Sequence, residues 1–147
     1  MKSPLLRDLP PDWFTLALIK PNALEHRQII MKEINLRGFV VHALRYVQLE
    51  EEDVRYLYVA HVDKPYFQAH MEFMTSGPVV AMVLYRFEAL NGWRKLMGET
   101  DPSKAKPGTL RARFGNPNVL RENAVHGSDS PEAALREAEY LFPYEAP

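Results

Sequence analysis

Residues 123–142 read NAVHGSDSPEAALREAEYLF, and this stretch says more about the fold than any other segment of the chain. A short apolar segment at 124–125 is typical of a strand, and a helix pattern follows it closely. Ser130 can serve as the N-cap of that helix, and Pro131 suits its first turn. His126 lies between the two elements, at an edge where sites are commonly built. The stretch predicts a short strand, then one imidazole, and then the start of a capped helix.

A carboxylate follows this imidazole at a spacing that allows a helix to bring the two side chains together. Glu137 lies seven residues beyond Ser130, which is about two helical turns. It can therefore accept a hydrogen bond from one ring nitrogen of His126, the orienting role of the third group in a catalytic triad. Gly127 and Ser128 are small neighbours that leave room for a reacting group. Taken alone, the spacing is equally compatible with a structural histidine that caps a turn.

The rest of the chain predicts a few strands separated by helices. Apolar and β-branched runs predict three further strands, at 14–19, 39–49 and 79–85. Helix patterns and their flanking breakers predict helices at about 23–37, 51–61, 66–73 and 88–97. Residues 98–123 are rich in glycine and proline and lack periodicity, and loops of this length are more often functional than accidental. The order of elements indicates an α+β or an α/β architecture with a sheet covered by helices.

The length of 147 residues predicts one domain spanning 1–147, in which residues 1–12 form an extended, proline-containing lead-in. A formal charge of −1 provides no field that would attract nucleic acid or an anionic membrane. No apolar run is long enough to span a bilayer. The chain has no cysteine, which excludes disulfides and thiolate metal sites. We therefore expect a cytoplasmic protein without a membrane or specific nucleic-acid partner.

Basic residues at element ends predict a phosphate-handling pocket. Lys20 ends the first strand, Arg94 lies on the helix before the long polar segment, and Arg111 and Arg113 lie within that segment. Together with Thr100, these groups could bind a polyphosphate. Neither a Walker sequence nor a dinucleotide fingerprint is present, and HExxH and EF-hand patterns are absent as well. The residues alone thus favour a phosphate pocket beside a candidate histidine nucleophile.

His61 resembles His126 in its placement at an element edge, and it lies in an aromatic segment with Tyr58 and Tyr66. Aromatic side chains at helical spacing more often pack in a core than bind a ligand. A residue just after a proline turn is nevertheless well placed to stack on a flat ring, which favours Tyr66. We interpret the remaining histidines as structural or surface residues: His26, His42 and His70.

The segment NAVHGSDS resembles the active-site signature N-x-x-H-G-S-D-S of nucleoside diphosphate kinases. Three further segments resemble the same family in the same order: TLALIKPNAL (15–24), SGPVVAMVL (76–84) and LMGETDPSKAKPGTLRA (96–112). The likeness extends from about Phe14 to Phe142. It implies an α+β fold, a ferredoxin-like βαββαβ core with a four-stranded antiparallel sheet covered by helices, and a homo-oligomer, either a tetramer or a hexamer.

The resemblance also implies a reaction and a set of site residues. The γ-phosphate of a nucleoside triphosphate such as ATP would pass to a nucleoside diphosphate by a ping-pong mechanism, through a phosphohistidine, and so maintain nucleoside triphosphate pools. His126 would attack with Nδ1, Glu137 would hold the other ring nitrogen, and Ser128 would link to that glutamate. Lys20, in this view, serves both catalysis and binding. The nucleotide-binding positions are Lys20, Tyr58, His61, Tyr66, Arg94, Thr100, Arg111 and Asn123.

Within that set, Tyr66 occupies the base-stacking position that is usually a phenylalanine in the family. Lys20 and Asn123 match groups at the sugar hydroxyl end. In the family, Mg²⁺ is bound through the nucleotide phosphates without direct protein ligands, so no protein metal site is expected. An inactive binding protein on the same fold would be expected to lack at least one of these residues, and all are present.

The chain departs from the family pattern at three places. It has KPN where KPD is usual, and Asn22 is expected to keep a turn-forming role. The segment RARFGNPNVLREN is about two residues longer than usual, which leaves Val119 and Leu120 as alternatives for the second residue of the base clamp. The N-terminal lead-in is also longer than is typical.

Overall fold

The computed structural model describes residues 6–143 of the chain. The predicted lead-in therefore lies partly outside the described residues. Within them, Leu6–Asp8 forms a short 3₁₀ helix (η1), and Leu6 is buried. This segment is anchored by an apolar contact with the core, which the prolines around it did not predict.

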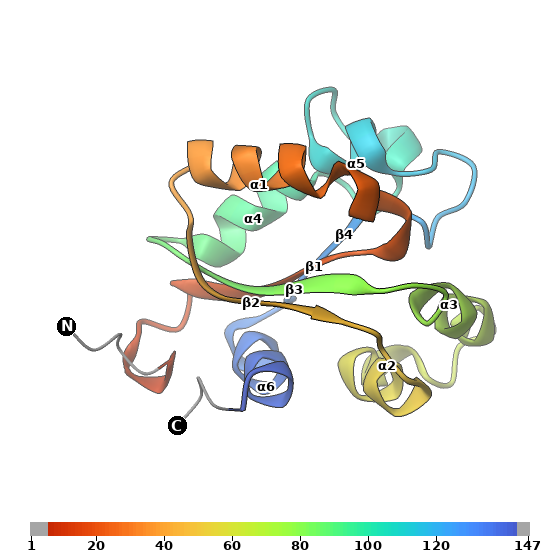
Figure 1. Cartoon of the computed structure of the whole chain (residues 1–147), viewed down its shortest axis with the longest axis horizontal. Helices are drawn as coiled ribbons and strands as arrows, with labels where there is room; N and C mark the ends of the chain where they lie inside the picture. The colour runs from red at the N-terminus through yellow and green to blue at the C-terminus, as the bar shows by residue number, and fades with distance from the viewer. Residues whose placement is uncertain (1–5, 144–147) are drawn as a thin grey trace.

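Four strands form one antiparallel sheet in the order β2-β3-β1-β4 (Figure 1). The strands are β1 (Phe14–Ile19), β2 (Val40–Val47), β3 (Val79–Tyr85) and β4 (Val125–Gly127). The central pair β1 and β3 runs in register from Phe14 opposite Tyr85 to Ile19 opposite Val80. With the helices between the strands, this topology confirms the predicted ferredoxin-like βαββαβ core.

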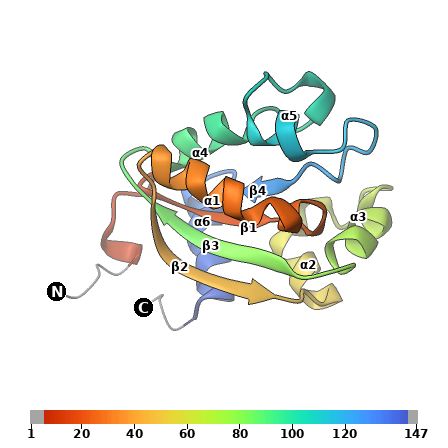
Figure 2. The same cartoon turned by 45° about the horizontal axis from the view of Figure 1, so that its top comes forward.

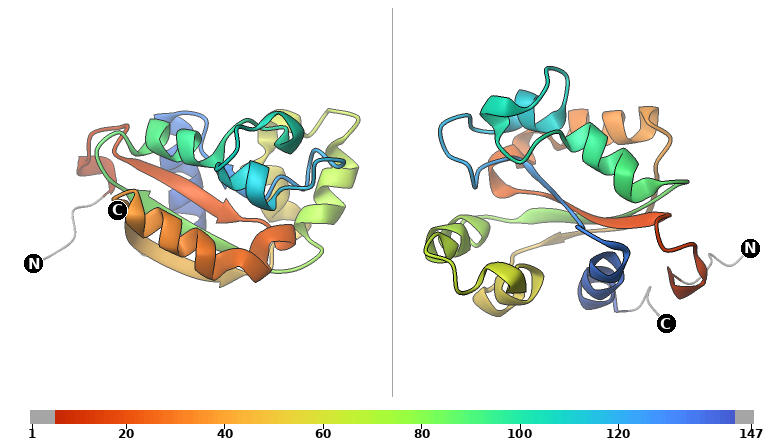
Figure 3. Two further views of the ribbon diagram at one scale, coloured as in Figure 1. Left: turned by 90° about the horizontal axis from the view of Figure 1, so that it is seen from above. Right: turned by 180° about the vertical axis from the view of Figure 1, so that it is seen from behind.

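Helices cover both faces of the sheet (Figures 1 and 3). One face carries α1 (Arg27–Leu36), α4 (Ala89–Met97) and α5 (Leu110–Phe114). The other face carries α2 (Glu51–Leu57), α3 (Phe67–Met74) and α6 (Pro131–Leu141). Short 3₁₀ helices lie in the connections: η2 (Pro21–His26), η3 (Val59–His61) and η4 (Pro102–Lys104). No helix within residues 6–143 is both long and apolar enough to cross a bilayer.

The central strands bury both of their faces because a helical layer lies on each side. Along β1, Leu16 and Leu18 pack in the cluster with α2, α3 and α6, whereas Ala17 and Ile19 pack in the cluster with α1 and α4. This alternation follows from the two-residue period of a strand. Each of these leucines is fully buried, so truncation to alanine would cost about 2–5 kcal/mol.

Continuous apolar runs predicted β1 and β3 with their observed bounds, and the closing helix begins as expected. The hydroxyl of Ser130 accepts a hydrogen bond from the backbone of Ala133, and Pro131 occupies the first turn of α6. The helix expected at 23–37 is different, because its first turns form the 3₁₀ helix η2 and α1 begins only at Arg27. Gly38 ends α1 with a φ of 81°, as its position predicted.

The polar segment 98–123 contains more regular structure than its sequence indicated. It includes η4 and α5, and the Thr109 hydroxyl accepts a hydrogen bond from the backbone of Ala112 at the start of α5. A helix of five residues is too short to show a helical period. Figure 2 shows α5 and its flanking loops on the side of β4. The last strand starts at Val125, one residue later than expected, because Ala124 has a left-handed φ of 74°.

Candidate functional site

Strand β4 carries His126 between the two helical layers. It pairs with β1, where His126 lies opposite Leu18 and Gly127 opposite Ala17. Figure 3 shows β4 leading from the loops near α5 to α6. The indole nitrogen of Trp93, a fully buried residue of α4, donates a hydrogen bond of 3.0 Å to the carbonyl oxygen of His126. The backbone of His126 is therefore held from two sides.

Gly127 has a different role from the one expected. A Cβ at this position would lie 2.5 Å from the Trp93 ring and 2.7 Å from the terminal carbon of Met97. Real Cβ atoms do not approach so closely, and the buried indole cannot move aside. The glycine therefore lets α4 pack against β4, and the space that it leaves is filled by Trp93 rather than by a reacting group.

His126, Glu137 and Ser128 meet in one hydrogen-bonded group. His126 Nε2 lies 2.9 Å from Glu137 Oε1, and the Ser128 hydroxyl donates to the same oxygen over 3.0 Å. The imidazole is 12% exposed and the carboxylate 4%. The backbone N–H of Ser128 donates to the Thr15 hydroxyl, and the Ser128 hydroxyl oxygen accepts from Leu16 N–H. Because Nε2 is engaged by the carboxylate, Nδ1 is the ring nitrogen left for chemistry.

Lys20 lies at the end of β1, in contact with the start of β4. Its ammonium donates to Asn123 Oδ1 over 2.8 Å, and the Asn123 amide donates to the carbonyl oxygen of Thr100. The side chain is buried, and this burial, with the nearby charge of Arg111, lowers the pKa of Lys20 to about 7. A buried ammonium without a counter-charge is costly. An anion bound beside it would therefore restore the full charge of Lys20.

Tyr58 forms an aromatic wall beside the imidazole. Its ring centroid lies 5.3 Å from that of His126, and Lys20 Nζ lies 5.9 Å from the Tyr58 centroid. Burial, followed by the charge of Glu137, raises the pKa of Tyr58, so the phenol stays protonated. Its hydroxyl is buried and has no hydrogen-bond partner within the described part of the chain. A buried hydroxyl without a hydrogen bond is uncommon in folded proteins.

His70 packs against the Tyr58 ring, and the expectation that it is a surface or satisfied histidine was wrong. The two ring centroids are 4.3 Å apart in an edge-to-face arrangement. Nε2 of His70 is buried without a partner among residues 6–143. Burial first, and then the charges of Lys20 and His126, lower the pKa of His70 to about 3, so the ring is neutral. The amphipathic pattern of α3 did not distinguish this histidine from a solvent-exposed one.

Arg94, Thr100 and Arg111 line a cleft of about 990 Å³ that also reaches Gly127. Arg111 is buried, and its guanidinium donates to the carbonyl oxygens of Gly98 and Val125. Burial lowers its pKa to about 10, so it is still charged at neutral pH. Three lysines extend the positive lining: Lys95, Lys104 and Lys106. The exposed guanidinium of Arg94 lies 3.4 Å from Asp129, a weak contact that an incoming anion could replace.

The remaining predicted residues lie at the rim, next to Tyr58. The ring of His61 is 6.5 Å from that of Tyr58, and its Nδ1 lies 2.5 Å from the hydroxyl oxygen of Tyr66. Tyr66 is 52% exposed. The structure therefore brings the predicted set together in three groups: the His126 cluster with Lys20, the arginine-lined cleft, and the His61–Tyr66 pair.

Two residues that the sequence did not indicate, Trp93 and Thr15, support this arrangement, and Asn22 supports it through a contact that the sequence did not indicate. Trp93 and Thr15 fix the backbone of β4, as described above. Asn22 lies within the turn in which Ala23 N–H donates to the carbonyl oxygen of Lys20. Its side-chain amide has a second role, because it donates to the carbonyl oxygen of Glu122 over 2.8 Å, across the long segment. An aspartate at this position could not donate that bond. The contacts of Thr15 and Asn22 join residues about one hundred positions apart, and that of Trp93 spans 33 positions, so no local sequence pattern could have predicted them.

The acidic groups of the cleft do not form a dedicated metal centre. Among residues 6–143, no three histidine, aspartate or glutamate side chains are grouped so that they could hold an ion. The cleft contains the carboxylates of Glu99, Asp101 and Asp129 among its cations. Mg²⁺ commonly binds through substrate phosphates with few protein ligands. The donor set therefore fits a Mg²⁺ ion that arrives with a polyphosphate.

A cleft lined by cationic side chains, near an imidazole that is held by a carboxylate, is typical of a phosphotransferase. Comparisons with known proteins agree with this class. The family model described as nucleoside diphosphate kinase matches residues 14–146. This chain belongs to the nucleoside diphosphate kinase family. It is accordingly an enzyme of the phosphotransferase class.

Individual relatives support the same assignment. The nucleoside diphosphate kinase of Geobacter sulfurreducens is 41% identical over 130 residues, which cover 87% of this chain and 93% of that protein. Nucleoside diphosphate kinase 2 of Protochlamydia amoebophila is 43% identical, with coverages of 87% and 90%. The solved structure of the Aquifex aeolicus enzyme matches with a TM-score of 0.84 at 36% identity, over 92% of this chain and 99% of that one. A Halobacterium salinarum nucleoside diphosphate kinase in complex with CDP matches with a TM-score of 0.82 at 34% identity, over 89% and 88%.

Proposed function

We propose that this protein transfers the γ-phosphate of ATP, or of another nucleoside triphosphate, to nucleoside diphosphates through a phosphohistidine on His126. The observation that carries the proposal is the engagement of Nε2 by the buried carboxylate of Glu137, at 2.9 Å. This contact leaves the lone pair of Nδ1 for attack, and it stabilises the positive charge that develops on the ring. Ser128 completes the arrangement, since its hydroxyl orients the carboxylate.

The reaction consists of two matched half-reactions. In the first, the lone pair of His126 Nδ1 forms a bond to the γ-phosphorus, and the bond from that phosphorus to the bridging oxygen breaks. The electron pair leaves with the nucleoside diphosphate. In the second, a terminal oxygen of an acceptor diphosphate attacks the phosphohistidine, and the N–P bond breaks. One site therefore serves donor and acceptor in turn, which is a ping-pong mechanism.

The cationic side chains supply most of the binding and charge neutralisation. Phosphoryl transfer needs positioning and compensation of charge rather than much covalent chemistry. Lys20 and Arg111 are buried; Lys20 lies near the Tyr58 ring that packs against His126, and Arg111 donates to the carbonyl oxygen of Val125, the residue before His126. Arg94 and Thr100 line the cleft that reaches Gly127, the residue after it. Mg²⁺, bound through the nucleotide phosphates, would neutralise further charge on them. Asn123 would contact the sugar hydroxyls together with Lys20, to which it is hydrogen-bonded.

The base would stack at the rim of the site. Tyr66 offers an exposed aromatic face, and stacking of this kind tolerates all bases because each has a π-face. For the opposite side of the base we propose Leu120, which is 57% exposed, rather than the half-buried Val119. Broad base specificity would suit a role in balancing nucleoside triphosphate pools, in keeping with the proposed cytoplasmic location of a chain without cysteines.

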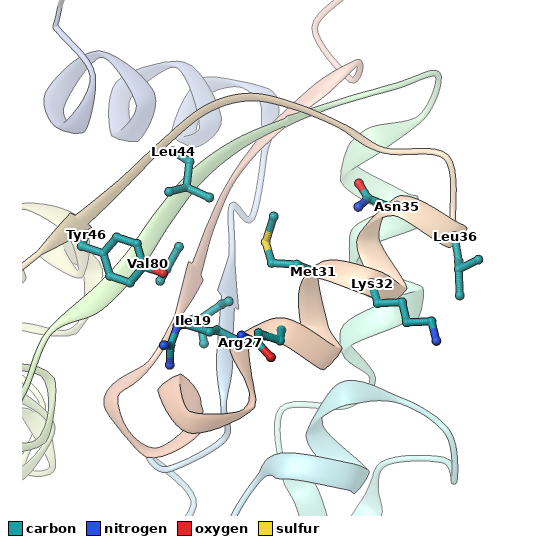
Figure 4. A pocket seen from close by; sticks show the side chains of 10 residues that line it. Ile19, Arg27, Met31, Lys32, Asn35, Leu36, Leu44, Tyr46 and Val80 are labelled. Carbon is teal, nitrogen blue, oxygen red and sulfur yellow. The ribbon is translucent and has the colours of Figure 1, made fainter.

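We further propose that the protein is a homo-oligomer, in which the β2 strands of two subunits pair with each other. β2 is an edge strand of the sheet, and its Leu44 and Tyr46 are 42% and 59% exposed. Together with Met31 of α1, they line a groove of about 670 Å³ (Figure 4). An exposed apolar edge strand invites pairing, and antiparallel pairing about a two-fold axis would match β2 with its own copy. Tyr46→Glu should reduce the mass measured by light scattering, and an unchanged mass would exclude this interface.

The reaction is tested by mixing the protein with ATP, GDP and Mg²⁺ and following GTP by chromatography. We expect the wild type to form GTP and His126→Ala to form none. His26→Ala, which changes a partly exposed histidine stacked on Phe114, is the matched control and should remain active. GTP formation by His126→Ala at the wild-type rate would refute the proposal.

A further inference from the structure

The hydroxyl of Tyr66 has a partner that a phenylalanine could not have. It lies 2.5 Å from Nδ1 of His61, and the two ring centroids are 5.8 Å apart. If the aromatic ring alone were needed to stack a base, the hydroxyl would be dispensable. The geometry instead links the residue proposed to hold the base to a residue proposed to bind the phosphates.

The backbone holds these two side chains in a fixed relation. His61 ends η3, and its N–H donates to the carbonyl oxygen of Tyr58 over 2.9 Å. The carbonyl oxygen of His61 accepts from Lys64 N–H, and the carbonyl oxygen of Lys64 accepts from Phe67 N–H at the start of α3. Two consecutive turns thus connect His61 to Tyr66. The pair is next to the Tyr58 ring, which packs against His126.

The direction of this hydrogen bond decides which nitrogen of His61 carries the proton. A neutral imidazole has one N–H donor and one acceptor nitrogen. If the Tyr66 hydroxyl donates to Nδ1, the ring proton lies on Nε2, which can then donate to an anion. If Nδ1 donated to the hydroxyl instead, Nε2 would present a lone pair, which a phosphate oxygen repels. A bound phosphate therefore favours donation by the tyrosine.

We propose that Tyr66 is a positioning residue for His61: its hydroxyl fixes the ring orientation and the Nε2–H tautomer with which His61 donates to the nucleotide phosphates. This inference rests on the proposed function, because it requires a phosphate at the site. It assigns to the hydroxyl a role that is separate from stacking of the aromatic ring on the base. The loss caused by removal of the hydroxyl should therefore be the same for every base.

The test is a double-mutant cycle at pH 8, above the ordinary titration range of imidazole. Tyr66→Phe keeps the ring and removes only the hydroxyl, and it should lower kcat/KM for ADP, GDP and CDP alike by about three- to tenfold. In the His61→Phe background, Tyr66→Phe should cause no further loss, since the partner of the hydroxyl is gone. Tyr56→Phe, on α2, is the control for loss of a tyrosine hydroxyl and should be unchanged.

Equal losses in the two backgrounds, or a loss confined to one base, would overturn the inference. Nitrogen-15 spectra of the histidines provide a readout that does not depend on activity. The wild type should show His61 in the Nε2–H tautomer, and Tyr66→Phe should shift it toward a mixture; identical spectra would also contradict the proposal. If wild type lacks phosphoryl transfer but shows this tautomer shift, the proposed function fails while the hydrogen bond stands.

Discussion

Nucleotide binding should draw a proton from solution onto Lys20. In the free protein, burial and the charge of Arg111 lower the pKa of Lys20 to about 7, from its ordinary value of 10.5. A bound polyphosphate supplies the opposite charge that the buried amine lacks, so the pKa should return toward its ordinary value. A group whose pKa is raised by a ligand takes up a proton between the two pKa values. Nucleotide affinity should accordingly weaken as pH rises through this window, from about 7 upward.

The size of the effect follows from the pKa of the free protein. At pH 8, an amine with a pKa of about 7 is about nine-tenths neutral, so binding should take up about 0.9 proton per site. At pH 6 the amine is already charged, and its uptake should be about 0.1 proton. The terminal phosphate of ADP has a pKa of about 6 and contributes little at pH 8. The higher pH therefore isolates the lysine.

Isothermal titration calorimetry with ADP measures this uptake, from the dependence of the binding enthalpy on the ionisation enthalpy of the buffer. Lys20→Met should abolish most of the uptake at pH 8. Lys32→Met, on α1 and outside the arginine-lined cleft, should leave it unchanged. Wild-type binding without proton uptake at pH 8, or equal uptake by Lys20→Met, would refute the assignment of a buried lysine with a lowered pKa at the phosphate site.

Three further substitutions test the structure around the imidazole. Glu137→Gln keeps a hydrogen-bond acceptor but removes the charge, so steady-state kinetics should show kcat about tenfold lower with ADP affinity unchanged; an unchanged kcat would remove its orienting role. His70→Leu replaces a buried imidazole that has an unpartnered nitrogen, and urea denaturation should show a free energy of unfolding about 1 kcal/mol higher; a clear loss of stability would mean that this nitrogen has a partner. Gly127→Ala forces a Cβ against Trp93 and Met97 and should lower the free energy of unfolding by about 1–3 kcal/mol, a difference that a thermal scan would detect; an unchanged melting temperature would show that the indole can move.

The central strands were the easiest elements to predict from sequence, for a physical reason. β1 and β3 bury both faces, so their apolar residues are continuous and end at proline or polar breakers. α5 was missed because five residues cannot show a period, and η2 was merged with α1 because both have helical spacing. Sheet order was not readable from any local pattern. It came from the resemblance to a known family.

In the site, too, contacts between residues close in sequence were predicted, and properties that depend on distant residues were not. The spacing of His126 and Glu137 predicted a contact, because a single turn and two helical turns connect them. The lowered pKa of Lys20 and the burial of His70 depend on elements that are distant in sequence. The role of Gly127 was misassigned for this reason, since its neighbour Trp93 lies on another helix.

The central claim is that the phosphoryl group rests on His126 between the two half-reactions. Incubation with γ-labelled ATP and Mg²⁺, without an acceptor, tests it most directly. We predict a labelled protein whose label is labile in acid, stable in base and transferred to added GDP, and we predict no label on His126→Ala. An acid-stable label, such as a phosphoserine at Ser128 would give, or a label that persists on His126→Ala, would contradict the mechanism.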